Sequence, residues 1–204
     1  MPSLAEIWRA LRGAWRLLFL DTRGLADFDG TRSGGLRSFW AIAAVLPLNI
    51  AIIAIDALGP SSDVLPPHDA AFQVIGSIVA WLLLLGFIYG LVSWYGRPER
   101  YWLFVATYNW TQIPLAVAVL AIVALVFAAG GLVDLNDLES ASGGTALVAG
   151  SALLVAAALR FAVYAYEWYV AWVSLDAGVA LPIIVVLLDI VLGLGLDKIA
   201  NAMA

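Results

Sequence analysis

The chain has 204 residues, of which 64% are hydrophobic and only 12% are charged, and its mean hydropathy is +0.98. Soluble domains average about a quarter charged residues, so this composition excludes a soluble globular protein and indicates a protein embedded in a membrane. The net charge is −5, and the absence of cysteine excludes disulfides, thiolate metal sites and cysteine nucleophiles.

The first segment, from Ser3 to Leu20, has the pattern of an amphipathic helix rather than of a membrane span. Apolar residues recur at helical spacing, and most of the charged residues fall on the other side. The apolar residues are Leu4, Ile7, Trp8, Leu11, Ala14, Trp15 and Leu18, and the charged ones are Glu6, Arg9, Arg12 and Arg16. We predict a helix that lies on the inner membrane surface, with its tryptophans at headgroup depth and its arginines toward anionic lipids. The alternative is a helix docked on the cytoplasmic face of the protein itself.

Five apolar segments follow, and each is long enough to cross about 30 Å of hydrocarbon as an α-helix. They cover roughly residues 36–58, 70–95, 101–129, 145–172 and 179–196. The sequence therefore predicts an all-α integral membrane protein with a cytoplasmic amphipathic helix and loop in residues 1–35. Five transmembrane helices would occupy residues 36–204.

The second segment contains Gly86 and Gly90, a G-x-x-x-G pattern that lets another helix approach closely. That helix could belong to the same chain, to a second copy or to another membrane protein. The loop from Gly130 to Gly144 is acidic, but it lacks the ligand spacing of a calcium hand. We interpret its carboxylates as solvated, and we predict neither a metal nor a cofactor.

The basic residues predict the orientation of the chain. Eight arginines precede the first span, open it, or lie between the second and third spans, whereas the loops after spans one and three have none. Arginines near short loops stay in the cytoplasm, so the amino terminus is predicted inside and the carboxyl terminus outside an inner membrane. A belt of aromatic residues marks the same predicted cytoplasmic ends: Trp40, Trp94, Tyr95, Tyr101, Trp102, Trp168, Tyr169 and Trp172.

Polar residues interrupt the third span. Tyr108, Asn109, Thr111 and Gln112 lie close together, and Pro114 follows them. Unpaired amides in hydrocarbon cost roughly several kcal/mol each, so these side chains are predicted to face other helices rather than lipid.

Three further polar residues are predicted at a similar depth in other spans, namely Asn49, Arg160 and Asp189. Positions 160 and 189 are centred on the predicted turn at residues 174–178, so an antiparallel helix pair would place them level. We predict an ion pair between them, because an isolated charge costs about 2.5 to 3.5 kcal/mol near the bilayer centre. The alternative is that Arg160 extends to the interface beside Glu167.

The third span carries a resemblance to a known family. Tyr108 and Ile113-Pro114 within an apolar helix are similar to the tyrosine and downstream Ile-Pro of the Yip1-domain membrane proteins. That resemblance implies a cytoplasmic amino terminus followed by five closely spaced spans, from about Gly35 to Leu196. The eukaryotic members have an Asp-Leu-Tyr-Gly-Pro segment before the first span, and this chain instead has Gly34-Gly35-Leu36-Arg37-Ser38. The resemblance is therefore to a bacterial type.

Residue types argue against an enzyme. An intramembrane serine protease needs a histidine at membrane depth, yet His68 lies in a proline-rich loop. An aspartyl protease needs two membrane aspartates, and Asp189 is accompanied only by Asp197 at the membrane edge.

Two functional hypotheses remain. The first is a non-catalytic membrane scaffold or interaction protein, with the lipid bilayer and other membrane proteins as partners and no nucleic acid. The second is a small transporter or channel subunit, in which the intramembrane polar residues line a path for a solute, proton or ion.

Overall fold

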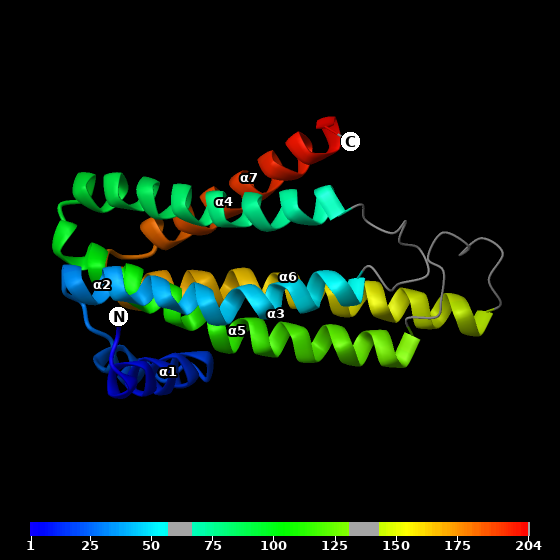
Figure 1. Cartoon of the computed structure of the whole chain (residues 1–204), viewed down its shortest axis with the longest axis horizontal. Coiled ribbons are helices and arrows are strands. Elements are labelled where there is room, and N and C mark those ends of the chain that lie inside the picture. Colours follow the sequence, from blue (N-terminus) through cyan, green and yellow to red (C-terminus); the bar gives the residue numbers. More distant parts are fainter. Residues whose placement is uncertain (57–66, 131–142, 204) are drawn as a thin grey trace.

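The structure is a computed structural model, and it describes residues 1–56, 67–130 and 143–203. Within those ranges the chain forms helices joined by short turns, without a strand (Figure 1). The α-helices are α1 (Leu4–Leu18), α2 (Arg32–Ser38), α3 (Ile42–Asp56), α4 (Pro67–Trp94), α5 (Tyr101–Gly130), α6 (Gly143–Leu175) and α7 (Ala180–Met203), and the short 3-10 helices are η1 (Thr22–Asp27), η2 (Phe39–Ala41) and η3 (Pro98–Arg100). The predicted proline-rich and acidic loops lie mostly outside the described residues.

The predicted all-α fold is confirmed, and so is its membrane-type composition. Three stretches of the described chain are long and apolar enough to cross a bilayer: Arg32–Ile52, Val74–Trp94 and Pro98–Leu125. A shorter apolar helix covers Ala180–Gly195. The length and apolar composition of these helices are those of a membrane protein. A count of five crossings stays a prediction.

Helix α5 is the centre of the packing. It contacts α1, α2, α3 and α6, whereas α4 packs mainly on α7 and α7 in turn packs on α6. In Figure 1, α4 and α7 lie together on one side of α3, α5 and α6. The core between α4, α5 and α7 is built from fully buried side chains, which include Leu84, Ile88, Phe104, Leu181 and Val185. Pro114 lies inside α5, which continues past it as one helix.

The amino-terminal helix is docked on the rest of the protein mainly through small residues. Ala10, Gly13, Ala14 and Leu17 are buried. A Cβ placed on Gly24 would lie only 2.5 Å from the Gly13 carbonyl oxygen. The backbones of α1 and η1 therefore touch at a point where only glycine fits.

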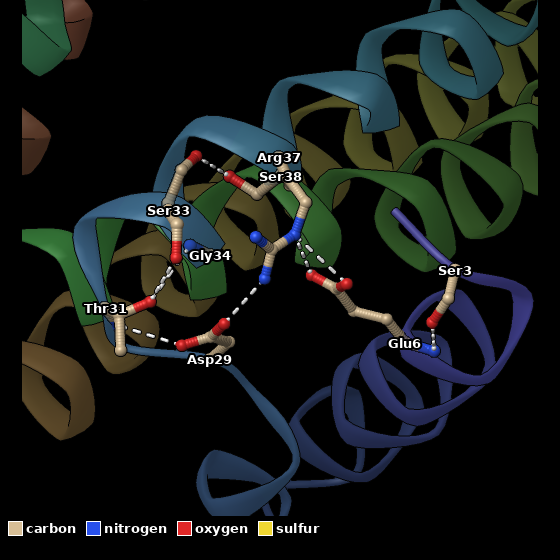
Figure 2. Close-up of polar contacts among 9 residues, drawn as sticks. Ser3, Glu6, Asp29, Thr31, Ser33, Gly34, Arg37 and Ser38 are labelled. Carbon is tan, nitrogen blue, oxygen red and sulfur yellow. Dashed lines mark hydrogen bonds and ion pairs between the residues drawn. The ribbon is translucent and has the colours of Figure 1, made fainter. Parts of the chain in front are cut away.

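Ion pairs fasten α1 to the segment that follows it. Figure 2 shows the Arg37 guanidinium between Glu6 of α1 and Asp29, at 2.9 Å and 2.8 Å from their carboxylate oxygens. Arg12 pairs with Asp27, and Arg16 lies 3.6 Å from the same carboxylate. Two of the arginines predicted to face anionic lipid thus contact carboxylates of the protein itself.

These pairs predict that acid releases α1. Asp27 accepts a hydrogen bond from Arg12, and this bond holds the pKa of the Asp27 carboxyl below its usual value, against the opposing effect of partial burial. A carboxylate with a lowered folded pKa stabilises the folded state above its unfolded pKa, and that contribution is lost as the pH falls through the folded pKa. Spin labels on cysteines at Ala5 and Glu99 would measure the expected separation of α1 at acidic pH.

Asp27→Asn provides the control for that measurement. It should broaden the distribution of distances between the labels already at neutral pH, and the further change in acid should be smaller than in the wild type, because only the Glu6–Arg37–Asp29 pairs remain to be broken. A wild-type distance that stays constant through acid exposure would contradict the prediction, because it would mean that apolar contacts alone hold α1.

Candidate functional site

An amide lies at the centre of the first polar cluster, which we call the amide network: Ser38, Trp81 and Asn109. The Asn109 amide nitrogen donates to the Ser38 hydroxyl at 2.8 Å, and the Trp81 indole N–H donates to the Asn109 oxygen at 3.1 Å. Ser38 donates in turn to the Gly35 carbonyl at 2.6 Å. Asn109 is fully buried, so its hydrogen bonds tie α2, α4 and α5 together at one point.

A second cluster, the carboxyl network, consists of Tyr108, Glu167 and Asp189. The Tyr108 hydroxyl donates to the Glu167 carboxyl at 3.1 Å. Glu167 and Asp189 also interact with each other through their side chains. The network therefore connects α5, α6 and α7. It joins the predicted polar residues Tyr108 and Asp189 to Glu167, which the sequence places at the interface and which is buried here.

The turn between α6 and α7 decides which residues lie level. Helix α6 ends at Leu175 and α7 begins at Ala180, so this hairpin is centred near Gly178, a residue with a φ of +73° that favours glycine. The centre is a few residues later than the sequence suggested. As a result, Glu167 and not Arg160 lies level with Asp189.

Arg160 has its own surroundings on the exposed face of α6. Its Nε donates to the Tyr164 hydroxyl at 3.3 Å, and its guanidinium lies 6.0 Å from the centre of the Tyr164 ring. Arg160 also acts electrostatically on Asp189. It thus belongs to the edge of the carboxyl network.

The remaining predicted polar residues are distributed around these two networks. The Thr111 hydroxyl donates to the Tyr108 carbonyl within α5 at 3.0 Å. Asn49 on α3 and Gln112 on α5 are half-buried, and neither belongs to the amide or the carboxyl network. The structure therefore brings Tyr108, Asn109 and Asp189 into defined contacts, and leaves Asn49 and Gln112 beside them.

The predicted membrane-surface helix presents an apolar strip, which we call the N-terminal ridge: Leu4, Trp8, Trp15 and Phe19. Trp8 is 72% exposed and Phe19 is 77% exposed, and the Trp15 and Phe19 rings stack at 6.4 Å. The ridge lies on a different face of α1 from the buried residues Ala10, Gly13 and Ala14. Helix α1 is thus docked on the protein and still exposes its tryptophans beside Arg9, which is also exposed.

Glycines predicted to admit another helix lie in open space. A Cβ on Gly86 or Gly90 would meet nothing within 4 Å, so no described helix of this chain approaches α4 there. A contact with another protein or a second copy through these glycines stays a prediction.

Comparisons with protein-family models, with curated proteins and with solved structures give no match. The resemblance to the Yip1-domain family therefore stays a prediction based on Tyr108 and Ile113-Pro114.

Chemically, the arrangement offers buried hydrogen-bonding groups and one pair of carboxyls. Among the residues that the structure describes, no three His, Cys, Asp or Glu side chains converge in a way that could hold a metal ion. Within the described part of the chain, the buried side-chain atoms without a hydrogen-bond partner are the Tyr166 and Tyr169 hydroxyls and the second carboxyl oxygen of Glu167. The Glu167 oxygen belongs to the carboxyl network. Glu167 is thus a member of that network with one oxygen bonded to Tyr108 and the other without a hydrogen bond.

Proposed function

We propose that this protein is a non-catalytic integral membrane protein of Yip1-like type, which organises or shapes the bilayer or a complex within it. The main support is the N-terminal ridge, because large apolar side chains that a folded protein leaves exposed mark a membrane or protein interaction site. Because α1 packs on α5, the ridge is attached to the bundle, unlike a free amphipathic tail. It therefore displaces lipid at a fixed position beside the transmembrane helices.

The chemistry of α1 suits the cytoplasmic leaflet. Tryptophan rings favour headgroup depth, and each arginine near an anionic surface contributes about 1 kcal/mol of attraction. Arg12 and Arg16 are partly neutralised by Asp27, so Arg9 should contribute most of the electrostatic attraction. The apolar side chains of the ridge should accordingly contribute more to membrane binding than electrostatic attraction does, so raising the salt concentration should weaken binding only slightly.

Membrane tubes pulled from giant vesicles test this function. We expect the reconstituted full-length protein, with α1 on the outer leaflet, to concentrate in the curved tube relative to the flat membrane. Changing Trp8 and Trp15 together to alanine should abolish the enrichment. Trp94 is 79% exposed but lies on α4, so Trp94→Ala serves as the matched control and should keep it. Equal enrichment of the ridge variant and the wild type would rule out the ridge as the shaping element.

The proposal places the protein in an inner membrane with its amino terminus in the cytoplasm and its carboxyl terminus outside. Single cysteines at Ser61 and Ser140 should react with an impermeant maleimide added to intact cells, because the loops that contain them lack arginine. A cysteine at Glu99 should react only after permeabilisation. Glu99 is exposed and avoids the strain that a cysteine would meet at Gly96, where φ is +72°. Labelling at Glu99 alone in intact cells would reverse the orientation.

A second candidate function is a small transporter or channel subunit. The observation that favours it is the carboxyl network, since ionisable residues within membrane helices often mark ion or proton paths. Reconstituted vesicles distinguish the two functions. Saturable solute or proton flux that is lost on Asp189→Asn or Gln112→Ala would favour transport, whereas tube enrichment without flux favours the scaffold.

A further inference from the structure

We infer that Glu167 and Asp189 form a proton-binding site, which holds one proton between two carboxyl groups and thereby ties α6 to α7. The site is separate from the N-terminal ridge and does not depend on the proposed function. Its ligand is a proton taken from water.

Burial is the first step of the argument. Glu167 is only 7% exposed. One of its oxygens accepts the Tyr108 hydroxyl at 3.1 Å, while the other is buried without a hydrogen-bond partner. A buried carboxylate with an unsatisfied oxygen is costly, because burial removes the water that would solvate its charge and nothing replaces it.

The neighbouring charges provide the second step. Helix α5 presents Tyr108 to Glu167, and α7 presents Asp189. On α6 itself, Arg160 acts on Asp189. Elsewhere on the packed elements, Asp21, just before η1, acts on Tyr169, Tyr89 of α4 acts on Tyr101, and Asp176 after α6 pairs with Arg97 and Arg100.

With these neighbours, the pair needs one proton. Two ionised carboxylates side by side in apolar surroundings repel each other, whereas a single shared proton lets one carboxyl donate to the other. The donated bond would satisfy the orphan oxygen of Glu167. Asp189 is the more exposed member of the pair.

A shared proton also has a structural consequence. Helix α4 packs mainly on α7, so the attachment of α7 to α6 governs the attachment of both. Removing the proton would place two negative charges in the α6 and α7 contact and loosen the pair α4 and α7 from the rest of the bundle.

Infrared difference spectroscopy of the full-length protein in detergent tests the site. We expect one protonated carboxyl C=O band at neutral pH that disappears in alkali. Glu167→Gln keeps the acceptor for Tyr108 and preserves the shape of the side chain, so it should fold. The variant should lack the band, because Asp189 alone can then ionise beside Arg160. Glu99→Gln, a change at an exposed acid, should leave the band intact.

Thermal unfolding provides a second readout that tolerates a poorly folded variant. The wild-type midpoint should fall from neutral to alkaline pH, and the midpoint of Glu167→Gln should stay constant over that interval. A neutral-pH band that survives in Glu167→Gln, or a wild type without such a band, would overturn the inference. So would loss of the band on adding Na⁺ or Li⁺ at constant pH, because the pair would then be a metal cation site.

Discussion

Gly24→Val is expected to force α1 and η1 apart, to displace α1 on the bundle and to lower the free energy of unfolding by about 1 to 3 kcal/mol, the usual cost of overpacking. The added Cβ would lie 2.5 Å from the Gly13 carbonyl oxygen and 2.9 Å from the Cβ of Arg16. The first of these is a backbone atom, so a change of side-chain rotamer cannot relieve the clash. Either η1 or α1 must move.

The measurement is the distance between spin labels at Ala5 and Glu99, combined with thermal unfolding in detergent. Gly90→Ala is the matched control, since a Cβ there meets nothing within 4 Å and alanine favours a helix by about 1 kcal/mol over glycine. That control should be neutral or stabilising. A docked α1 in Gly24→Val would show that the close contact of the two glycines does not hold the helix.

Asn109→Ala is the second change with a large expected effect. It removes the acceptor of the Trp81 indole and the donor to Ser38, and it leaves buried polar groups unsatisfied at a cost of about 1 to 3 kcal/mol in unfolding free energy. The loss should be concentrated in the attachment of α4 to α5, which have few other contacts. The hydrogen bond from the Tyr101 hydroxyl to the Leu85 carbonyl, at 3.2 Å, is one of those that remain.

Gln112→Ala is the internal comparison for this prediction. It deletes the same kind of side chain from the same helix, one turn away, but Gln112 is only half-buried and lies outside both networks. Unfolding in detergent should show a clearly smaller loss for Gln112→Ala. A double-mutant cycle with Trp81→Phe isolates the indole bond, and strict additivity of the two changes would mean that the bond contributes nothing.

Much of the helical architecture followed from the sequence, because long apolar segments bounded by glycine, proline and charge have few alternatives to a helix. Helix α5 was expected over residues 101–129 and is observed over Tyr101–Gly130. The burial of Asn109 was expected as well, since an amide at that position of an apolar helix needs a partner. Its actual partners, Ser38 and Trp81, could not be named, because the order of helices around α5 does not follow their order in the chain.

The carboxyl network was only half predictable. Glu167 lies among aromatic residues near the predicted end of its span, a setting typical of an interface. The pair could have been found by comparing distances from the turn between the two helices. At 1.5 Å per residue, Glu167 is about 12 Å from the end of α6 and Asp189 is about 14 Å from the start of α7, so the two lie nearly level. That count requires the exact ends of the helices, which the sequence does not supply.

The docking face of α1 was missed for a different reason. Hydrophobic periodicity is dominated by large residues such as Trp8 and Trp15, and it therefore indicates the ridge. The buried face consists of Ala10, Gly13, Ala14 and Leu17, and three of these four are small residues, which matter for close approach more than for hydrophobicity. Small residues reveal such a contact only when the partner, here Gly24, is known.

The pairing of α4 with α7 sets an order of events during synthesis. The end of α4 is made about 85 residues before α7 begins, and at roughly 5 to 20 residues per second this interval is on the order of 4 to 17 s. Throughout that time the residues of α4 that finally face α7 have no permanent neighbour, while α5 and α6 already emerge. Helix α4 must therefore be sheltered by the insertion machinery or by lipid until the last helix arrives, and a ribosome stalled before α7 would leave an incomplete chain that quality-control proteases can recognise.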